Sequence, residues 1–255
     1  MTESQCKKPG QRVVAIVQAR MSSTRLPGKV LVKVQGKTLL AHHIERARQA
    51  SSLDAVVVAT TTNPADDAIV ALCGDLGFAV VRGSEGDVLS RYALAARQHR
   101  ADFVVRLCAD CPLIDPDIVD AIVRAFLDHG PGLAYASNRL VHTYPRGLDA
   151  EVCTAAALYE ADCEATDAAD REHVTPFIWR QPQRYRLLNV PCHQTDVQDH
   201  RWTVDTAEDL ELVRRIIDAL YPTKPQFRMQ DCLAVVDAHP DWAALNSHVQ
   251  QRLLG

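Results

Sequence analysis

A run of cations follows the first strongly apolar stretch of the chain. The stretch is Val13–Val17, and Arg20, Arg25 and Lys29 come soon after it, with Gly28 beside the last of them. Arginine offers planar, bidentate donors to phosphate oxygens, lysine offers a compact charge, and backbone N–H groups in a loop of small residues complete an anion nest. Open α/β sheets place their ligands at the carboxyl ends of such strands. The segment therefore predicts a polyphosphate-binding loop rather than an ordinary solvated basic loop.

Two acidic residues stand just past later apolar stretches. Asp110 follows Phe103–Leu107, and Asp205 follows Trp202–Val204. Magnesium is usually held by one or two carboxylates together with substrate phosphates, so two acids at strand ends facing a cationic loop suit it. Structural roles stay open for both positions. These are an Asx turn at Asp110, and a helix cap formed by Asp205 with Glu208 or by Thr206 with Asp209.

Three other motifs are incomplete. Gly36-Lys37-Thr38 is similar to the end of a P-loop, but Leu31 stands where its first glycine belongs. No G-x-G-x-x-G follows the first apolar stretch, so a nicotinamide enzyme is not indicated. Cys108 and Cys111 have the C-x-x-C spacing of half a zinc site or a redox dithiol, but the sequence has no second pair at similar spacing.

Five short stretches rich in β-branched residues alternate with segments of helical spacing. This alternation is typical of a mostly parallel sheet with crossover helices. Helices are expected over residues 39–50 and 65–76, and a third begins with Asp115 as its cap and Pro116 as its first residue. The predicted class is a doubly wound α/β fold. Its strands are expected at Val13–Val17, Ala55–Thr60, Ala79–Val81, Phe103–Leu107 and Leu133–Ala136.

After residue 144 the pattern loosens. The chain then divides into a main domain at 12–220, with a distinct segment at 144–200, and a helical tail at 226–255 beyond the proline-containing linker Tyr221–Pro225. The elements expected here are helices at Ala155–Cys163, Arg171–Arg180, Glu208–Leu220 and Met229–Leu254, and strands at Tyr185–Val190 and Trp202–Val204.

Composition narrows the class of protein further. The 255 residues are 47% hydrophobic and 24% charged, which is ordinary for a globular chain that buries a sizeable core. A net charge of −4 argues against binding nucleic acid, because a duplex requires a large basic surface. The first residues lack an apolar signal region or membrane span, so we expect a cytoplasmic protein with reduced cysteines and no membrane attachment.

Several segments, taken in order, resemble the cytidylyltransferase family that activates acidic sugars as CMP conjugates. The similar branch is that of spore coat polysaccharide biosynthesis protein F, and the CMP-Kdo and CMP-sialic acid synthetases are more distant. The segments that carry the resemblance are VVAIVQARMSSTRLPGKVL at 13–31, VVVATTTNPADD at 56–67, VVRGSEGDVLSRY at 80–92, VVRLCADCPLI at 104–114, RWTVDTAEDLE at 201–211 and the stretch 227–251.

The resemblance implies a nucleotide-diphospho-sugar transferase type of fold and a reaction between CTP and an acidic acceptor, with release of pyrophosphate, in surface polysaccharide or glycoconjugate synthesis. It implies that Arg20, Arg25 and Lys29 hold the triphosphate, and that Asp110 and Asp205 bind Mg²⁺. Such a transfer depends on positioning and charge neutralisation and needs no side-chain nucleophile. The nucleotide would also be lined by Ala19, Ser23, Thr60, Thr61, Ser84, Glu85 and Asp87, of which Ser84–Asp87 can equally be a helix cap.

The acceptor is expected to meet the segments 144–151 and 171–176. Arg146 and Arg171 would pair with its carboxylate. Asp149, Glu151 and His173 would bind its hydroxyl or amino groups, although a histidine at this point of a helix is equally consistent with a structural role. The resemblance further implies a homodimer formed through the segment 144–200.

Two other readings stay open. The first is a sugar-1-phosphate nucleotidylyltransferase or a glycosyltransferase of the same fold, although the Asp-x-Asp motif of glycosyltransferases is reduced here to Asp110 alone. The second is a nucleotide-binding module without turnover, which the presence of all the expected cations and carboxylates disfavours.

Overall fold

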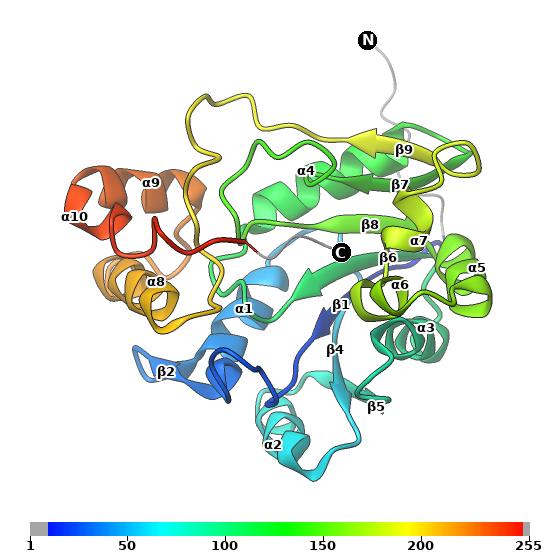
Figure 1. The fold of residues 1–255 in the computed structure, drawn as a ribbon, viewed down its shortest axis with the longest axis horizontal. Helices are drawn as coiled ribbons and strands as arrows, with labels where there is room; N and C mark the ends of the chain where they lie inside the picture. The colour runs from blue at the N-terminus through cyan, green and yellow to red at the C-terminus, as the bar shows by residue number, and fades with distance from the viewer. Residues whose placement is uncertain (1–9, 252–255) are drawn as a thin grey trace.

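The β-branched stretches assemble into one mixed sheet. In the computed structural model, which describes residues 10–251, the strand order is β5-β4-β1-β6-β8-β7-β9 (Figure 1). β8 runs antiparallel to β6 and β7, whereas the other neighbours are parallel. The strands of the sheet are β1 (Val13–Gln18), β4 (Ala55–Thr61), β5 (Ala79–Gly83), β6 (Phe103–Cys108), β7 (Leu133–Ser137), β8 (Glu151–Thr154) and β9 (Arg186–Asn189), and β2 (Lys33–Val34) pairs with β3 (Lys37–Thr38) as a separate hairpin.

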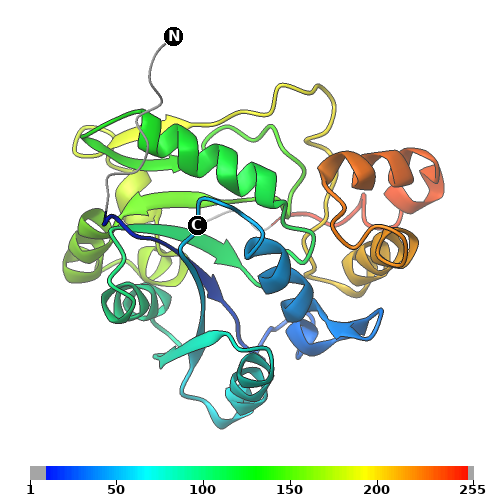
Figure 2. The ribbon, with the colours of Figure 1, turned by 180° about the vertical axis from the view of Figure 1, so that it is seen from behind.

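Helices cover both faces of this sheet, as the two opposite views show (Figures 1 and 2). One core lies between the sheet and α1, α4 and α8, and the other between the sheet and α3 and α5. Alternate residues of β1 enter the two cores, which is why this strand is aliphatic throughout. The doubly wound, mostly parallel α/β class is confirmed. The helices are α1 (Leu39–Ala47), α2 (Asp67–Asp75), α3 (Val88–Gln98), α4 (Pro116–Asp128), α5 (Ala155–Glu164), α6 (Ala168–His173), α7 (Pro176–Trp179), α8 (Ala207–Leu220), α9 (Met229–Asp237) and α10 (Pro240–Ala243), with 3-10 turns at Lys29–Leu31 and Pro64–Asp66.

Two helix starts follow the predicted cap chemistry. Asp115 caps α4 by accepting from the backbone of Asp117, and Pro116 is the first helical residue. Thr206 and Asp209 form a reciprocal capping box at α8. The structural reading of Thr206 with Asp209 is thus confirmed, and Asp205 is left for another role.

Three predicted elements are wrong in extent or type. The predicted helix 171–180 is split into α6 and α7, because Val174 has φ of 75° and Pro176 lacks an amide hydrogen. Residues 202–204 are not a strand of the sheet: Trp202 N donates to Arg146 O at 2.7 Å and Val204 N to Asp110 O at 2.7 Å, so two loops take the bonds that a strand would give. The tail is helical only in α9 and α10, and residues 252–254 of the prediction lie outside the described residues.

The parallel strands bring their carboxyl ends to one edge of the sheet. β1, β4, β5, β6 and β7 all end there, and the antiparallel β8 begins there. The residues just past these ends include Arg20, Ser84, Asp110 and Arg139. This edge therefore gathers Arg20, Ser84 and Asp110, which the sequence singled out, together with Arg139, which it did not. Within residues 10–251, no helix combines the length and apolarity that crossing a membrane requires.

Candidate active site

The loop after β1 is closed on itself by a glycine. Gly28 has φ of 70°, and its amide donates to Met21 O at 2.9 Å. A side chain at position 28 would be strained in this conformation and would approach the Met21 side chain to 3.3 Å. The tight closure turns the chain into the 3-10 turn that begins at Lys29, and it aims that lysine inward.

Lys29 joins the two predicted metal carboxylates. Its ammonium lies 3.2 Å from Asp110 Oδ2 and 3.0 Å from Asp205 Oδ1, and it donates to the Val204 carbonyl at 2.5 Å. Arg25 adds a second cation, 2.8 Å from Asp205 Oδ2. Four of the residues predicted from separate segments thus form one charged cluster, which we call the Lys29 centre: Arg25, Lys29, Asp110 and Asp205.

Electrostatics fix the charges of this centre. Burial alone would raise the pKa of Asp205, but Lys29, Arg25 and Arg201 outweigh it, and the pKa lies below the ordinary value. Burial alone would lower the pKa of Lys29, but Asp110 and Asp205 raise it. Both Asp205 and Lys29 are therefore charged at neutral pH.

The donor set of the Lys29 centre fits a divalent cation. The ammonium of Lys29 touches both carboxylates, so Asp110 and Asp205 face one point where a positive charge is favourable. Within residues 10–251 no group of three or more His, Cys, Asp or Glu side chains is arranged to hold a metal. Two carboxylates with the remaining positions open are what Mg²⁺ uses when phosphates complete its shell.

A histidine on α1 contacts the turn that carries Asp110. His43 on α1 is fully buried and its Nδ1 lies 2.7 Å from the Cys111 carbonyl. Burial lowers the pKa of His43 to about 4, so it is neutral and adds no charge. Burial also raises the pKa of Cys108 to about 11 and that of Cys111 well above its ordinary value, so both are uncharged thiols at neutral pH.

A second network of hydrogen bonds joins the loops that follow β1, β4 and β5, where the sequence predicts the nucleotide. Glu85 accepts from Ser22 Oγ at 2.5 Å and from Asn63 Nδ2 at 3.1 Å. Asp66, only 2% exposed, accepts from Met21 N at 2.7 Å and from Thr61 Oγ1 at 2.5 Å, which fastens the loop after β1 to the end of β4. Sequence reasoning missed Asp66 and Asn63, although Asn63-Pro64 is a cap signal for the 3-10 turn that follows.

Other predicted nucleotide residues are placed around this network. Ala19 and Thr60 are buried, and no hydrogen-bond partner of Thr60 Oγ1 is present in residues 10–251. Arg20 is half-buried, and its charge helps to lower the pKa of Glu85, after the hydrogen bonds to that carboxylate. The remaining three make local structural bonds: Ser23 Oγ accepts from Leu26 N at 3.5 Å, Ser84 Oγ accepts from Asp87 N at 3.2 Å, and Asp87 caps α3.

On the acceptor side, Glu151 is held inside the protein. It is 2% exposed and pairs with Arg106 and with Arg139, the latter at 2.8 Å, and it accepts from Tyr135 at 2.7 Å and from Thr175. Burial alone would raise its pKa, but the two arginines lower it to about 2. Sequence reasoning missed Arg106 and Arg139, although a charge inside the apolar stretch FVVRLC signals a buried partner.

Of the other predicted acceptor residues, Arg171 is paired within the chain, whereas Arg146 and His173 both lie within electrostatic reach of Arg139. Arg171 pairs with Asp87 and with Asp162, the latter at 3.1 Å, so it joins α6 to α3 and α5. Arg146 stays at the sheet edge, where its backbone bridges to Arg201 and its charge is felt by neighbouring Asp149 and Arg139. His173 is half-buried, and burial lowers its pKa.

Gly147 locks the acceptor loop against the segment that carries Asp205. Its φ is 100°, and a Cβ at this position would lie 2.6 Å from the Trp202 carbonyl carbon and 2.7 Å from Thr203 N. Only glycine permits so close a backbone approach. Residues 144–150, the predicted acceptor loop, and the segment that carries Asp205 are therefore in direct backbone contact.

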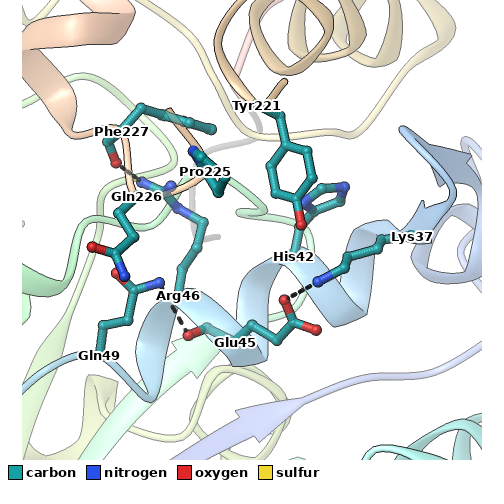
Figure 3. Close-up of a pocket in the computed structure, with 9 residues that line it drawn as sticks. All are labelled: Lys37, His42, Glu45, Arg46, Gln49, Tyr221, Pro225, Gln226 and Phe227. Atoms are coloured by element: carbon teal, nitrogen blue, oxygen red, sulfur yellow. Dashed lines mark hydrogen bonds and ion pairs between the residues drawn. The ribbon is translucent and has the colours of Figure 1, made fainter. Parts of the chain in front are cut away.

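A separate cavity of about 210 Å³ lies between α1 and residues 221–227 (Figure 3). Arg46 stacks on the Phe227 ring at 4.1 Å from its centroid and donates to the Phe227 carbonyl at 2.9 Å. The His42 and Tyr221 rings meet edge to face. None of the nine lining residues belongs to the Lys29 centre, and these contacts fasten the linker to α1. We therefore assign the cavity to packing rather than to the reaction.

Comparison with known proteins agrees with the geometry. The chain is 33% identical over 241 residues to spore coat polysaccharide biosynthesis protein SpsF of Bacillus subtilis, covering 91% of this chain and 96% of that one. A solved cytidylyltransferase from Leptospira borgpetersenii has a TM-score of 0.87 at 31% identity, over 95% of this chain and 99% of its own. A CMP:2-keto-3-deoxy-manno-octonic acid synthetase complexed with CTP has the same fold, with a TM-score of 0.62 at 20% identity over 82% of this chain and 99% of its own. Since residues 14–226 also match the cytidylyltransferase family, the chain belongs to that family of nucleotidyltransferases.

Proposed function

We propose that the protein transfers CMP from CTP to an acidic acceptor, a sugar acid or a similar anion, and releases pyrophosphate. The observation that carries the proposal is the Lys29 centre, in which two cations from the loop after β1 meet Asp110, just past the end of β6, and Asp205, just before α8. The family membership and the CTP complex of a structural relative support CTP as the nucleotide.

The cations of the loop would hold the triphosphate. In the structure Arg25 and Lys29 pair with carboxylates; the Arg25 side chain is 28% exposed and Arg20 is half-buried, whereas Lys29 lies inward between Asp110 and Asp205. An acceptor oxygen would attack the α-phosphorus, the bond from that phosphorus to the bridging oxygen would break, and the electron pair would leave on pyrophosphate. The three cations would stabilise the charge that develops on this leaving group.

We propose that Asp110 and Asp205 hold Mg²⁺ in the loaded enzyme. A structural relative, Rv0371C from Mycobacterium tuberculosis, was solved as a complex with manganese. Mg²⁺ bound there would neutralise phosphate charge. The chain's own part is to present two carboxylates whose geometry is set by neighbouring bonds before the ligands arrive.

We propose that the cytidine lies over the ends of β4 and β5. Thr60, Thr61 and Ser84 stand at these ends, and the Glu85 network fixes the loops around them. The proposal also includes Ala19, Ser23 and Asp87, whose backbones and caps shape the same loops. Fixed hydrogen-bonding groups can discriminate cytosine from uracil, which exchange a donor for an acceptor.

The acceptor would bind beyond Asp110, where Arg146 and Asp149 lie. Arg139 joins this side: its side chain is anchored on Glu151 yet remains 37% exposed, so its outer face can reach an anion. We propose that Arg139 and Arg146 meet the acceptor carboxylate, with Asp149 and His173 near its hydroxyl groups. Glu151 and Arg171 would act indirectly, through Arg139 and Asp87, because both are already paired within the chain.

Pyrophosphate release tests the proposal. Each of the four ribonucleoside triphosphates would be incubated with Mg²⁺, reductant and a panel of 2-keto sugar acids, sugar phosphates and phosphonates. Release with CTP and an acidic acceptor supports the proposal. Release with another triphosphate and a sugar phosphate would instead show a sugar-1-phosphate nucleotidylyltransferase, and CTP binding without release across the panel would favour a module without turnover.

A further inference from the structure

The chain beyond α10 turns back toward the catalytic edge of the sheet, as both ribbon views show (Figures 1 and 2). We call residues 244–251 the return segment. Its Asn246 is only 3% exposed, and the Nδ2 amide donates to the Arg201 carbonyl at 2.9 Å and to Asp209 Oδ1 at 2.8 Å. Gln251 Oε1 accepts from Arg201 NH1 at 2.6 Å. The return segment therefore meets the molecule at Arg201 and Asp209.

Arg201 connects the return segment to Asp205, because its guanidinium bonds to both. Its Nε and NH2 donate to Asp209 at 2.9 and 3.3 Å, and NH2 also donates to Asp205 Oδ2 at 2.9 Å. With Gln251 on NH1, every nitrogen of the guanidinium has a partner. Asp205 Oδ1 is left toward Lys29 and the point that the two carboxylates share. The orientation of Asp205 thus depends on how firmly the Arg201 fork is held.

We propose that Asn246 and Gln251 are positioning residues for the metal-binding carboxylate Asp205, so that the return segment sets the affinity of the site for a divalent cation. This inference rests on the proposed function. Groups that orient a metal ligand through hydrogen bonds typically change metal affinity by about 10–100-fold when removed.

The packing of α9 shows that the tail does not depend on the return segment for its attachment to the main domain. Phe227, Met229, Leu233 and Val236 are buried in the main core and hold α9 in place without the return segment. Loss of the Asn246 amide should therefore leave the fold intact and loosen the Arg201 fork. Ser247 offers a matched control in the same segment, because its side chain is exposed and its hydroxyl donates to the nearby Ala244 carbonyl rather than to Arg201 or Asp209.

The test is a titration of the full-length chain with Mn²⁺ in the presence of CTP and without acceptor. Electron paramagnetic resonance measures the concentration of free Mn²⁺ at each step. Asn246→Ala is expected to raise the Mn²⁺ Kd by about tenfold. Gln251→Ala, at an exposed position that cannot unfold the protein, should raise it a few-fold, and Ser247→Ala should leave it unchanged. Asn246→Asp keeps the shape but turns donors into acceptors, and it should be at least as damaging as the alanine.

Two results would overturn the inference in distinguishable ways. If wild type binds Mn²⁺ with CTP and the Asn246 and Gln251 variants bind it equally well, the return segment is structural only, even if thermal unfolding shifts. If wild type itself binds no Mn²⁺ with CTP, the metal assignment of the proposed function fails and the inference fails with it. Should Asn246→Ala not fold, the Gln251→Ala titration decides alone.

Discussion

Two carboxylates at the same sheet edge are surrounded by cations, yet they are set up differently. Glu151 is 2% exposed and its partner Arg106 is 7% exposed, so both belong to the interior. Asp205 pairs with Arg25, whose side chain is 28% exposed and belongs to a loop rather than a strand. Each carboxylate also has a partner of the other kind, Arg139 at 37% exposure on Glu151 and Lys29 at 9% on Asp205. The rest of the surroundings differs: Glu151 also accepts from the hydroxyls of Tyr135 and Thr175, whereas the side chains that meet Asp205 in the described residues are the cations Lys29, Arg25 and Arg201. The comparison teaches that a carboxylate held by hydroxyls and an enclosed strand arginine is scaffold, and that one met by the cations of a loop can release them to a phosphate.

The largest expected effect is on stability, at Glu151. Glu151→Gln leaves Arg106 buried without its full partner, which should cost about 3–5 kcal/mol. Because the pKa falls from 4.5 to about 2 on folding, the carboxylate stabilises the protein above pH 4.5, and that stabilisation is lost as the pH falls toward 2. Urea unfolding between pH 7 and 3 would measure both effects.

Glu164→Gln is the matched control, since its exposed carboxylate pairs with Arg184 at the surface. It should unfold close to wild type at every pH. Equal stability of the Glu151 and Glu164 variants would show that Glu151 is not the scaffold we infer.

The next largest expected effect is on the rate of turnover, at the Lys29 centre. Asp110→Asn keeps the side-chain volume and removes one of the two carboxylates that face the shared point, so pyrophosphate release should fall roughly 10²–10³-fold with an unchanged melting temperature. Asp117→Asn, an exposed acid at the start of α4, should retain full activity. Wild-type rates in Asp110→Asn at saturating Mg²⁺ would remove Asp110 from the metal site.

A substitution at Gly147 tests whether the loop of residues 144–150 and the segment that carries Asp205 depend on each other. Gly147→Ala should destabilise the protein by about 1–3 kcal/mol beyond Gly132→Ala, because both glycines have positive φ but only position 147 meets the 202–203 backbone. Turnover should fall in the first variant alone. Indistinguishable melting curves for the two alanine variants would mean that the loop and the Asp205 segment move independently.

The smallest effect distinguishes binding from capping at Asp87. Asp87→Ala should lose about 1 kcal/mol of stability with the cap of α3. If the Ser84–Asp87 loop lines the nucleotide, KM for CTP should also rise a few-fold with kcat unchanged. Asp167→Ala removes the equivalent cap of α6 and should leave KM unaltered. The same KM in both variants would leave Asp87 with structural roles alone, as the cap of α3 and the partner of Arg171.

Local patterns predicted much of this structure. The apolar stretches gave the five predicted strands, and Asp115-Pro116 gave the start of α4, because both signals depend on neighbours in sequence. The helix predicted at 171–180 failed where Val174 takes a positive φ, and the strand predicted at 202–204 failed because Arg146 and Asp110 take its hydrogen bonds. Neither cause is visible in periodicity.

The residues of the site also fall into two groups, those that the sequence could predict and those that it could not. The cations of the loop and Asp110 could be found, since each follows a strand that ends at one edge. Asp205 could be found as well, although the apolar stretch before it is not a strand of the sheet. Asp66 with Met21, Arg139 with Glu151, and Asn246 with Arg201 could not be found, because each pair joins segments that only the fold brings together. What the sequence predicts is the chemistry at the strand ends, and what it misses are the residues that hold that chemistry in place.

The most direct test of the central claim is the CTP affinity of the full-length chain, measured by calorimetry with and without Mg²⁺, for wild type and for Asp110→Asn. If the Lys29 centre is the site of the triphosphate and its metal, Mg²⁺ should strengthen CTP binding to wild type and should have little effect on the variant. Equal strengthening by Mg²⁺ in both proteins, or none in wild type, would contradict the account.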